Sequence, residues 1–274
     1  MNAPRPATGS LYLVPTPLDF GCALPDDCAA LPLSLFLPDD TIRTAAGLDC
    51  WVTENAKSTR AFLKRVDAIH PLNAPLQAQQ ITELPRQVHK KGDHLPGGDE
   101  SAVRALLAPA LAGRDIGLVS EAGMPAIADP GSSVVRAAHA IGLPVKPLVG
   151  PISLMLALAA SGLNGQHFAF VGYVPQDAAE RGKRLRELES TALKTGQTQI
   201  LIETPYRNAV LLQTLLQVLQ PTTRLAACCG LGLPQQQVRS AAVADWKRCF
   251  LADGLPLSEP AVFLVGRCLL YTSP

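Results

Sequence analysis

The stretch from Asp115 to Leu163 constrains the fold more than any other part of this chain. Two short apolar runs, Ile116–Val119 and Val145–Val149, predict buried strands. A segment with a helical apolar face separates them, and a second apolar helix is expected to start at Ser153. This alternation of strand, loop and helix predicts a largely parallel sheet that is covered by helices on both faces.

The helix between these strands has recognisable start and stop signals. Asp129 is expected to cap its N-terminus, and Pro130 would occupy the first helical position. Gly142 stands where a C-terminal cap belongs. These signals place the loop Ser120–Pro125 at the carboxyl end of the preceding strand.

The same pattern extends over the rest of the chain and predicts an α/β fold in two domains, 1–162 and 163–274. Further strands are expected at Leu11–Val14, Asp49–Thr53, His167–Val174, Ile200–Ile202, Leu225–Cys229 and Ala261–Val265. Further helices are expected at about Lys57–Ile69, Ser101–Leu111, Arg181–Leu193, Tyr206–Leu219 and Val238–Phe250. Residues Gln77–Gly98, which include His89 and His94, read as an irregular exposed connection.

Composition excludes several classes of protein. Of 274 residues 47% are hydrophobic, and 24 Lys and Arg balance 23 Asp and Glu, so neither a disordered chain nor a polybasic nucleic-acid coat is expected. The beginning of the sequence lacks the apolar core of a signal peptide, and Gly150, Pro151 and Ser153 interrupt the most apolar stretch. We therefore expect a cytoplasmic protein that does not enter the membrane. The seven cysteines lack zinc-site spacing, so no metal is expected.

The sequence lacks the common nucleotide-binding and hydrolase motifs. There is no G-x-G-x-x-G, no G-x-x-x-x-G-K-[ST] and no G-x-S-x-G. The remaining candidates are three loops that follow predicted strands: Pro15–Pro17, Glu121–Pro125 and Gly150–Ser153. Ligands of open α/β sheets bind beyond the carboxyl ends of the strands, and glycines allow the backbone to approach them closely. The alternative is that these loops only connect strands to helices.

An ordered set of motifs resembles the tetrapyrrole (corrin/porphyrin) methylase superfamily. The motifs are Leu11–Pro17, Thr53–Asn55, Leu118–Gly131, Gly150–Pro151, Ala160–Leu163, Phe170–Pro175 and Glu203–Arg207. They are most similar to the branch that methylates a ribose 2′-hydroxyl in small-subunit ribosomal RNA. The resemblance covers Leu11 to about Arg267, and the segment Ser120–Gly131 is its most specific part.

The resemblance implies an S-adenosylmethionine-dependent methyltransferase with a cofactor cleft between its two α/β domains, usually as a homodimer. Transferred by position, the residues implied to bind the cofactor are Pro15, Thr16, Pro17, Leu18, Glu121, Ala122, Gly123, Met124, Pro125, Ile127, Ile152 and Ser153. Glu203 and Arg207 would face the substrate from the second domain.

The chain departs from the pattern of the ribosomal branch in four places. Ile-Gly-Asn-Leu after the first motif becomes Leu18–Gly21, and Gly-Pro-Ser-Ala becomes Gly150–Ser153. Glu-Asp-Thr-Arg-His-Thr becomes Glu54–Thr59, and Ser-Asp-Ala-Gly-Thr-Pro becomes Ser120–Pro125. Cofactor binding through backbone groups is compatible with these changes, whereas the side that holds the acceptor is altered. Methylation of a tetrapyrrole carbon and a non-catalytic cofactor-binding paralogue are therefore the alternatives.

A ribose hydroxyl needs a proton acceptor when it is methylated. Glu54 and Glu121 are the candidate carboxylates, although Glu54 could instead cap a helix and Glu121 could serve only to shape the cofactor loop. Lys57 could contact a phosphate, or act as a base if burial lowered its pKa. Arg60, Lys64 and Arg65 extend a basic helix from Lys57 that could contact RNA, as could Lys90–Lys91 and the cluster Arg181–Arg186, although such clusters are often only solvated surface.

Overall fold

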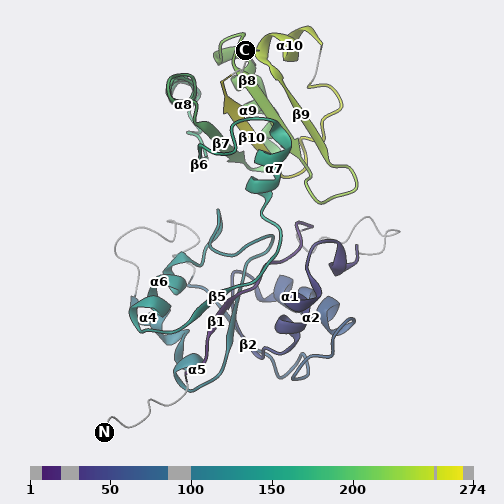
Figure 1. Cartoon of the computed structure of the whole chain (residues 1–274), viewed down its shortest axis with the longest axis vertical. Coiled ribbons are helices and arrows are strands. Elements are labelled where there is room, and N and C mark those ends of the chain that lie inside the picture. Colours follow the sequence, from purple (N-terminus) through teal and green to yellow (C-terminus); the bar gives the residue numbers. More distant parts are fainter. Residues whose placement is uncertain (1–7, 20–30, 86–99, 250–251, 268–274) are drawn as a thin grey trace, which may run out of the picture. The chain divides into compact units, whose positions relative to one another are not determined.

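The computed structural model describes residues 8–19, 31–85, 100–249 and 252–267. The chain forms two compact units, residues 1–152 and 153–274 (Figure 1). Each unit contains a β-sheet with helices packed against it, so the predicted α/β class is confirmed. Helix α7 (Ser153–Ser161) packs on strands of the second unit, whereas a boundary at 162/163 assigns it to the first.

The described part of the first unit contains a five-stranded parallel sheet in the order β3-β2-β4-β1-β5. Its strands are β1 (Leu11–Leu13), β2 (Cys50–Thr53), β3 (Gln80–Glu83), β4 (Ile116–Val119) and β5 (Val145–Pro147). The connection from β1 leads to β2 on one side, whereas the connection from β4 leads to β5 on the other. Because β1 and β4 are neighbours, the crevice at their carboxyl ends is a topological switch point, where open α/β sheets bind ligands.

Alternate residues of these strands are buried against helices on opposite faces. Cys50 and Val52 pack with α4 (Glu100–Ala105), α5 (Ala108–Leu111) and α6 (Ser132–Ala140). Trp51 points the other way, into a core formed with α1 (Asp39–Ala46) and α2 (Ala56–Asp67). Gly117 on β4 leaves room for this indole, because a Cβ there would lie 2.4 Å from Trp51 Cζ3.

Three predictions in the first unit are wrong in detail. The connection predicted to be irregular contains β3, which pairs with β2, while His89 and His94 lie outside the described residues. The single helix predicted over Ser101–Leu111 is two helices. Asp129 does not cap α6, because the cap residue is Gly131 with φ 131°. The carbonyl of Pro130 accepts a hydrogen bond from the amide of Ala126 at 3.3 Å, so Asp129 and Pro130 belong to the loop and the helix begins after Gly131.

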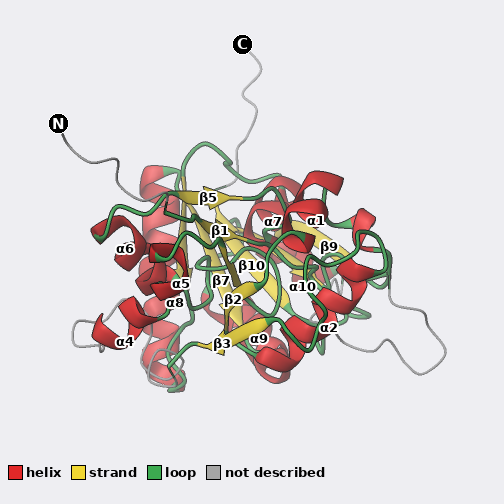
Figure 2. Cartoon of the chain, turned by 90° about the horizontal axis from the view of Figure 1, so that it is seen from below, coloured by secondary structure: helices red, strands yellow, loops and turns green. Residues whose placement is uncertain are grey.

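The described part of the second unit contains a mixed sheet in the order β6-β7-β10-β8-β9. Its strands are β6 (Phe168–Gly172), β7 (Thr198–Glu203), β8 (Arg224–Cys229), β9 (Gln237–Ala242) and β10 (Ala261–Gly266), all labelled in Figure 1. Strands β7, β9 and β10 are also labelled, in yellow, in Figure 2. The last described strand, β10, lies at the centre of the sheet and pairs antiparallel with both β7 and β8.

Helices cover both faces of this second sheet. Helices α8 (Ala178–Thr195), α9 (Asn208–Val218) and α10 (Val243–Arg248) pack on one face around Phe263, and α7 packs on the other. The helix predicted over Val238–Phe250 is wrong in its first half, which is strand β9. Its residues pair with β8 along their whole length, and this long-range pairing outweighs the weak local preference.

Candidate functional site

The loops after β1 and β4 are joined to each other at the switch point of the first sheet. Thr16 and Gly123 exchange two backbone hydrogen bonds, of 3.0 and 3.1 Å. The buried hydroxyl of Thr16 donates to the carbonyl of Ser120 at 3.3 Å. These contacts join the loops Pro15–Asp19 and Ser120–Pro125 into one surface beyond the carboxyl ends of β1 and β4, which we call the ledge.

The loop after β5 packs against this ledge at two glycines. A Cβ on Gly150 would lie 2.2 Å from Pro15 Cγ, which is too short for a contact between two carbon atoms. A Cβ on Gly123, where φ is 79°, would lie 3.2 Å from Leu18 Cδ2 and 3.4 Å from the carbonyl oxygen of Pro151. Glycine at both positions lets three loops meet with their backbones close together.

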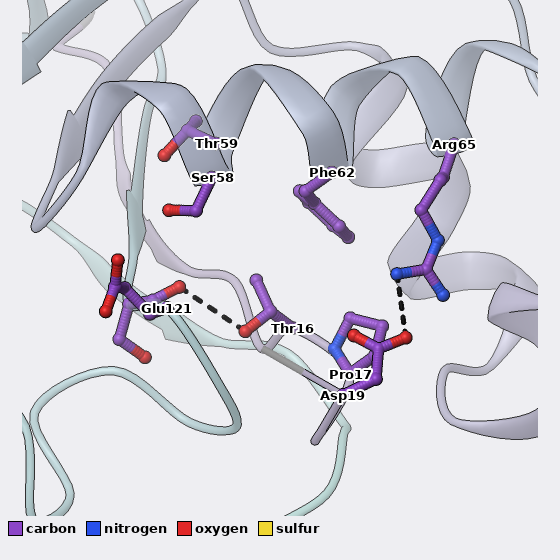
Figure 3. A pocket seen from close by; sticks show the side chains of 9 residues that line it. Thr16, Pro17, Asp19, Ser58, Thr59, Phe62, Arg65 and Glu121 are labelled. Carbon is purple, nitrogen blue, oxygen red and sulfur yellow. Dashed lines mark hydrogen bonds and ion pairs between the residues drawn. The ribbon is translucent and has the colours of Figure 1, made fainter. Parts of the chain in front are cut away.

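A small pocket lies between the ledge and helix α2 (Figure 3). Ser58, Phe62 and Arg65 project from α2 toward Thr16, Pro17 and Asp19. At one end the Arg65 guanidinium pairs with the Asp19 carboxylate at 2.9 Å. Glu121 lines the other end. The pocket is thus bounded by charged groups from three different segments of the first unit.

Asn55 links the start of α2 to the loop after β4. Its side-chain oxygen accepts hydrogen bonds from the backbone of Lys57 at 2.9 Å and of Ser58 at 3.4 Å, so it caps the helix. Its Nδ2 donates to Glu121 Oε1 at 2.7 Å. One side chain therefore holds both the helix N-terminus and the Glu121 carboxylate. The capping role left open for Glu54 belongs to Asn55 instead.

The loop Met124–Pro130 is strained. Ala126 and Ala128 have φ values of 65° and 63°, a conformation that costs a non-glycine residue about 1–2 kcal/mol. Ile127 lies between them and is 45% exposed. Strain of this kind persists where surrounding contacts enforce it, and it gathers at binding and catalytic sites.

Asp129 ends this strained loop beside two other carboxylates. Burial, together with the negative charges of Glu54 and Glu121, raises the pKa of Asp129 to about 7, while the Ser120 hydroxyl opposes the shift. Neither the motif search nor the spacing of acidic residues singled out Asp129 as functional. The available signal was the position of Asp129 within Ser120–Gly131, the most specific part of the family resemblance.

The structure places the predicted site residues in two groups. In the first unit it brings together Pro15–Leu18, Glu121–Pro125 and Pro151 at the ledge, with Glu54 nearby. Lys57 and Arg60 lie exposed on the first turns of α2. Ile152 ends the first unit, and Ser153 is the first residue of α7.

Glu203 and Arg207 form a separate ion pair in the second unit. Their side chains approach to 2.8 Å, and the Glu203 side chain is only 2% exposed. The Glu203 carboxylate also accepts a hydrogen bond from the backbone of Thr204 at 2.8 Å. Glu203 is therefore placed to position Arg207, and Arg207 is the member of the pair with access to solvent.

The described residues contain no grouping of three or more His, Cys, Asp and Glu side chains placed to hold a metal ion. Within the same ranges, no helix combines the length and hydropathy that crossing a bilayer requires.

The fold and the loop cluster define an α/β protein whose candidate site lies at the carboxyl edge of a parallel sheet. The chain belongs to the tetrapyrrole (corrin/porphyrin) methylase family, whose model matches residues 56–246. The solved structure of the methyltransferase CobJ has the same fold, with a TM-score of 0.53 and 17% identity over 95% of each chain.

Curated relatives carry the name ribosomal RNA small subunit methyltransferase I. The one from Vibrio cholerae is 37% identical over 44% of this chain and 41% of its own length. The one from Halalkalibacterium halodurans is 31% identical over 78% of this chain and 62% of its own length. The matched region thus spans less than two thirds of these relatives.

Proposed function

We propose that this chain is an S-adenosylmethionine-dependent methyltransferase that acts on RNA, with a ribose 2′-hydroxyl of small-subunit ribosomal RNA as the acceptor. The observation that carries the proposal is the meeting of three loops at the switch point, where Gly123 and Gly150 bring their backbones together. Family membership and the names of the relatives support the same activity.

The chemistry of the ledge fits a cofactor that carries a flat adenine ring and a positively charged sulfonium. Closely packed backbones offer N–H and C=O groups to a flat ligand, and Glu54, Glu121 and Asp129 supply negative charge beside them. Residues Pro15–Leu18, Glu121–Pro125 and Ile127, with Ile152 and Ser153, would hold the cofactor. When bound, the cofactor supplies an electrophilic methyl group on a sulfonium, and the protein supplies orientation.

The acceptor would be held by the residues around the start of α2. Glu54 belongs to the carboxylate group, and Lys57 and Arg60 are placed to contact phosphates of an RNA strand. Lys57 is exposed, so the burial on which a role as base depends is absent. In the second unit Arg207, positioned by Glu203, is a further candidate for contact with an RNA phosphate.

We further propose that the protein works in the cytoplasm as a homodimer. An RNA of the small ribosomal subunit is a cytoplasmic substrate in bacteria, and the resemblance to the methylase superfamily implies the dimer. Light scattering on the purified protein is expected to give twice the mass of 29.0 kDa.

Two measurements test the proposed function. Calorimetry with S-adenosylmethionine is expected to show saturable binding, and no binding at millimolar ligand would contradict every methylase assignment. Nucleoside mass spectrometry of ribosomal RNA should then show one methylated ribose that is lost on deletion of the gene and restored by the wild-type chain. An unchanged set of methylated riboses, with cofactor binding intact, would favour a tetrapyrrole acceptor or a non-catalytic paralogue.

A further inference from the structure

We propose that Asn55 is a positioning residue for the bound cofactor. Its side-chain amide holds one oxygen of the Glu121 carboxylate, so that the other oxygen accepts a hydrogen bond from a hydroxyl or ammonium group of S-adenosylmethionine. This inference rests on the proposed function. It adds a residue that was not among the candidates for cofactor binding, and it gives Glu121 a part in binding rather than in proton transfer.

The first observation is a hydrogen bond between two segments that lie 66 positions apart in the chain. Asn55 precedes α2, and its Nδ2 donates to Oε1 of Glu121, in the loop after β4, at 2.7 Å. Bonds from an N–H group to a carboxylate are stronger than bonds between neutral groups. Among the described residues, no group donates a hydrogen bond to the second oxygen, Oε2. Because Glu121 lines the pocket beside the ledge (Figure 3), this oxygen is available to a ligand there.

The second observation is that capping alone does not require asparagine. The Asn55 side-chain oxygen accepts two backbone hydrogen bonds at the start of α2. Asp177 does the same at the start of α8, with two bonds of 2.9 Å. Aspartate caps a helix as well as asparagine does, and its charge interacts favourably with the helix N-terminus. What an aspartate at position 55 could not do is donate a hydrogen bond to Glu121.

The third observation is that positions 55 and 121 depart together from the pattern of the ribosomal branch. That pattern has aspartate at both positions, whereas this chain has Asn55 and Glu121. In this chain a carboxylate at position 55 would lie against the Glu121 carboxylate and repel it. The amide replaces that repulsion with a hydrogen bond. The two departures therefore form one compensated change that keeps a carboxylate at the pocket.

The first test measures this link without a ligand. Urea unfolding is compared for the wild type, Asn55→Asp, Glu121→Gln and the double variant. Asn55→Asp is expected to lower the urea midpoint, because a donor is replaced by a like charge. Adding Glu121→Gln should raise the midpoint again, because the new amide at position 121 can donate to the new carboxylate at position 55. Additive effects of the two changes would overturn the proposal.

The second test measures the affinity of the same four proteins for S-adenosylmethionine by calorimetry. Asn55→Asp and Glu121→Gln are each expected to raise the Kd by about 10-fold or more, because a hydrogen bond to a charged group is lost. The double variant should regain stability but not affinity, since position 121 still lacks a carboxylate. A pair that only supported the fold would regain both.

S-adenosylhomocysteine shows which part of the cofactor Glu121 contacts. This product keeps the hydroxyl and ammonium groups and lacks the methyl group and the charge on sulfur. Its affinity should fall in the single variants by the same factor as that of S-adenosylmethionine. An unchanged affinity for S-adenosylhomocysteine would mean that Glu121 acts on the sulfonium charge, and the proposed hydrogen bond would be overturned.

Asp177→Asn is the matched control. It exchanges a carboxylate for an amide at the cap of α8, where the described partners of the side chain are backbone amides. This variant should unfold and bind S-adenosylmethionine as the wild type does.

The outcomes separate the inference from the function on which it rests. Wild-type affinity in Asn55→Asp would show that Asn55 does not position Glu121, and recovered affinity in the double variant would show that Glu121 does not contact the cofactor. Either result overturns the proposal with cofactor binding intact. If the wild-type chain binds no S-adenosylmethionine, the proposed function fails and the positioning role fails with it, whatever coupling the unfolding test shows.

Discussion

At the residue scale, Asp129 connects backbone conformation with charge. The strained loop places its carboxyl where burial and two like charges act on it together, and the pKa rises to about 7. Such a group destabilises the folded chain once it is ionised, so the ionised carboxyl of Asp129 lowers the free energy of unfolding. Asn55 has the opposite effect, since it satisfies both the N-terminus of α2 and the Glu121 carboxylate.

The raised pKa of Asp129 predicts a pH-dependent loss of stability. The unfolded carboxyl titrates near 3.8 and the folded one near 7, so the folded state binds the proton more tightly between these values. The free energy of unfolding should therefore fall with rising pH in this window, by at most about 1.4 kcal/mol per pH unit. In Asp129→Asn this contribution should disappear, so the variant should gain stability over the wild type at pH 8 but not at pH 4.

Urea unfolding at several pH values measures this difference. Asp40→Asn is the matched control, because the Asp40 side chain is 89% exposed and pairs only at the surface with Arg43. Asp40→Asn is expected to follow the wild-type pH dependence. Equal pH profiles for the wild type and Asp129→Asn would contradict the prediction.

At the scale of elements, the loops that follow the strands are packed against one another. Pro15 packs against Gly150, and the backbone of Thr16 is hydrogen-bonded to the backbone of Gly123. The hydrophobic core fixes where the strands end, and these contacts fix the paths of the chain beyond them. A change at a loop glycine should therefore act on stability and on ligand binding at once.

Replacing Gly150 with alanine is expected to destabilise the chain. The new Cβ would lie 2.2 Å from Pro15 Cγ, and relief requires one loop to move, at a cost of about 1–3 kcal/mol. The separation of the loops should also weaken S-adenosylmethionine binding. Thermal unfolding and calorimetry measure the two effects.

Gly165→Ala is the matched control for this substitution. A Cβ at Gly165 would have no atom within 4 Å, so this variant should unfold and bind as the wild type does. Wild-type binding by Gly150→Ala would show that the contact between Pro15 and Gly150 does not shape the ligand site.

At the scale of the whole molecule, the proposed cofactor should stabilise the folded chain. A ligand at 100 times its Kd that binds only the folded state raises the free energy of unfolding by about 2.7 kcal/mol. Differential scanning calorimetry with S-adenosylmethionine is expected to show this increase, whereas ATP at the same concentration should have little effect. An equal shift with ATP would indicate a nucleotide site of another kind.

Much of this fold could be predicted from sequence, because it depends on buried apolar runs and glycine turns. The predicted runs at Ile116–Val119 and Leu225–Cys229 appear as β4 and β8 with almost the same bounds. The two missed strands, β3 and β9, lie at the edges of their sheets. Their sequences contain many polar residues, and they form strands because they pair with β2 and β8. Such pairing depends on tertiary contacts that local sequence does not encode.

For the candidate site, the positions of the loops could be predicted from the sequence, but the contacts between their side chains could not. Glycines and prolines identified the loops that meet at the switch point, because a close backbone approach requires particular residue types. The link from Asn55 to Glu121 joins residues 66 positions apart, and the effect of Glu54 on Asp129 also needs the folded arrangement. Hydrogen bonds and charge effects between side chains of different loops therefore could not be predicted from the sequence.

The central position of β10 has a consequence for how this chain is made. The sheet of the first unit has all its described strands once residue 147 has been synthesised, so it can form while translation continues. The second sheet lacks its middle until residues 261–266 leave the ribosome, and until then the edges of β7 and β8 remain unpaired on the nascent chain. The second unit therefore exposes unpaired strand edges for longer during synthesis than the first.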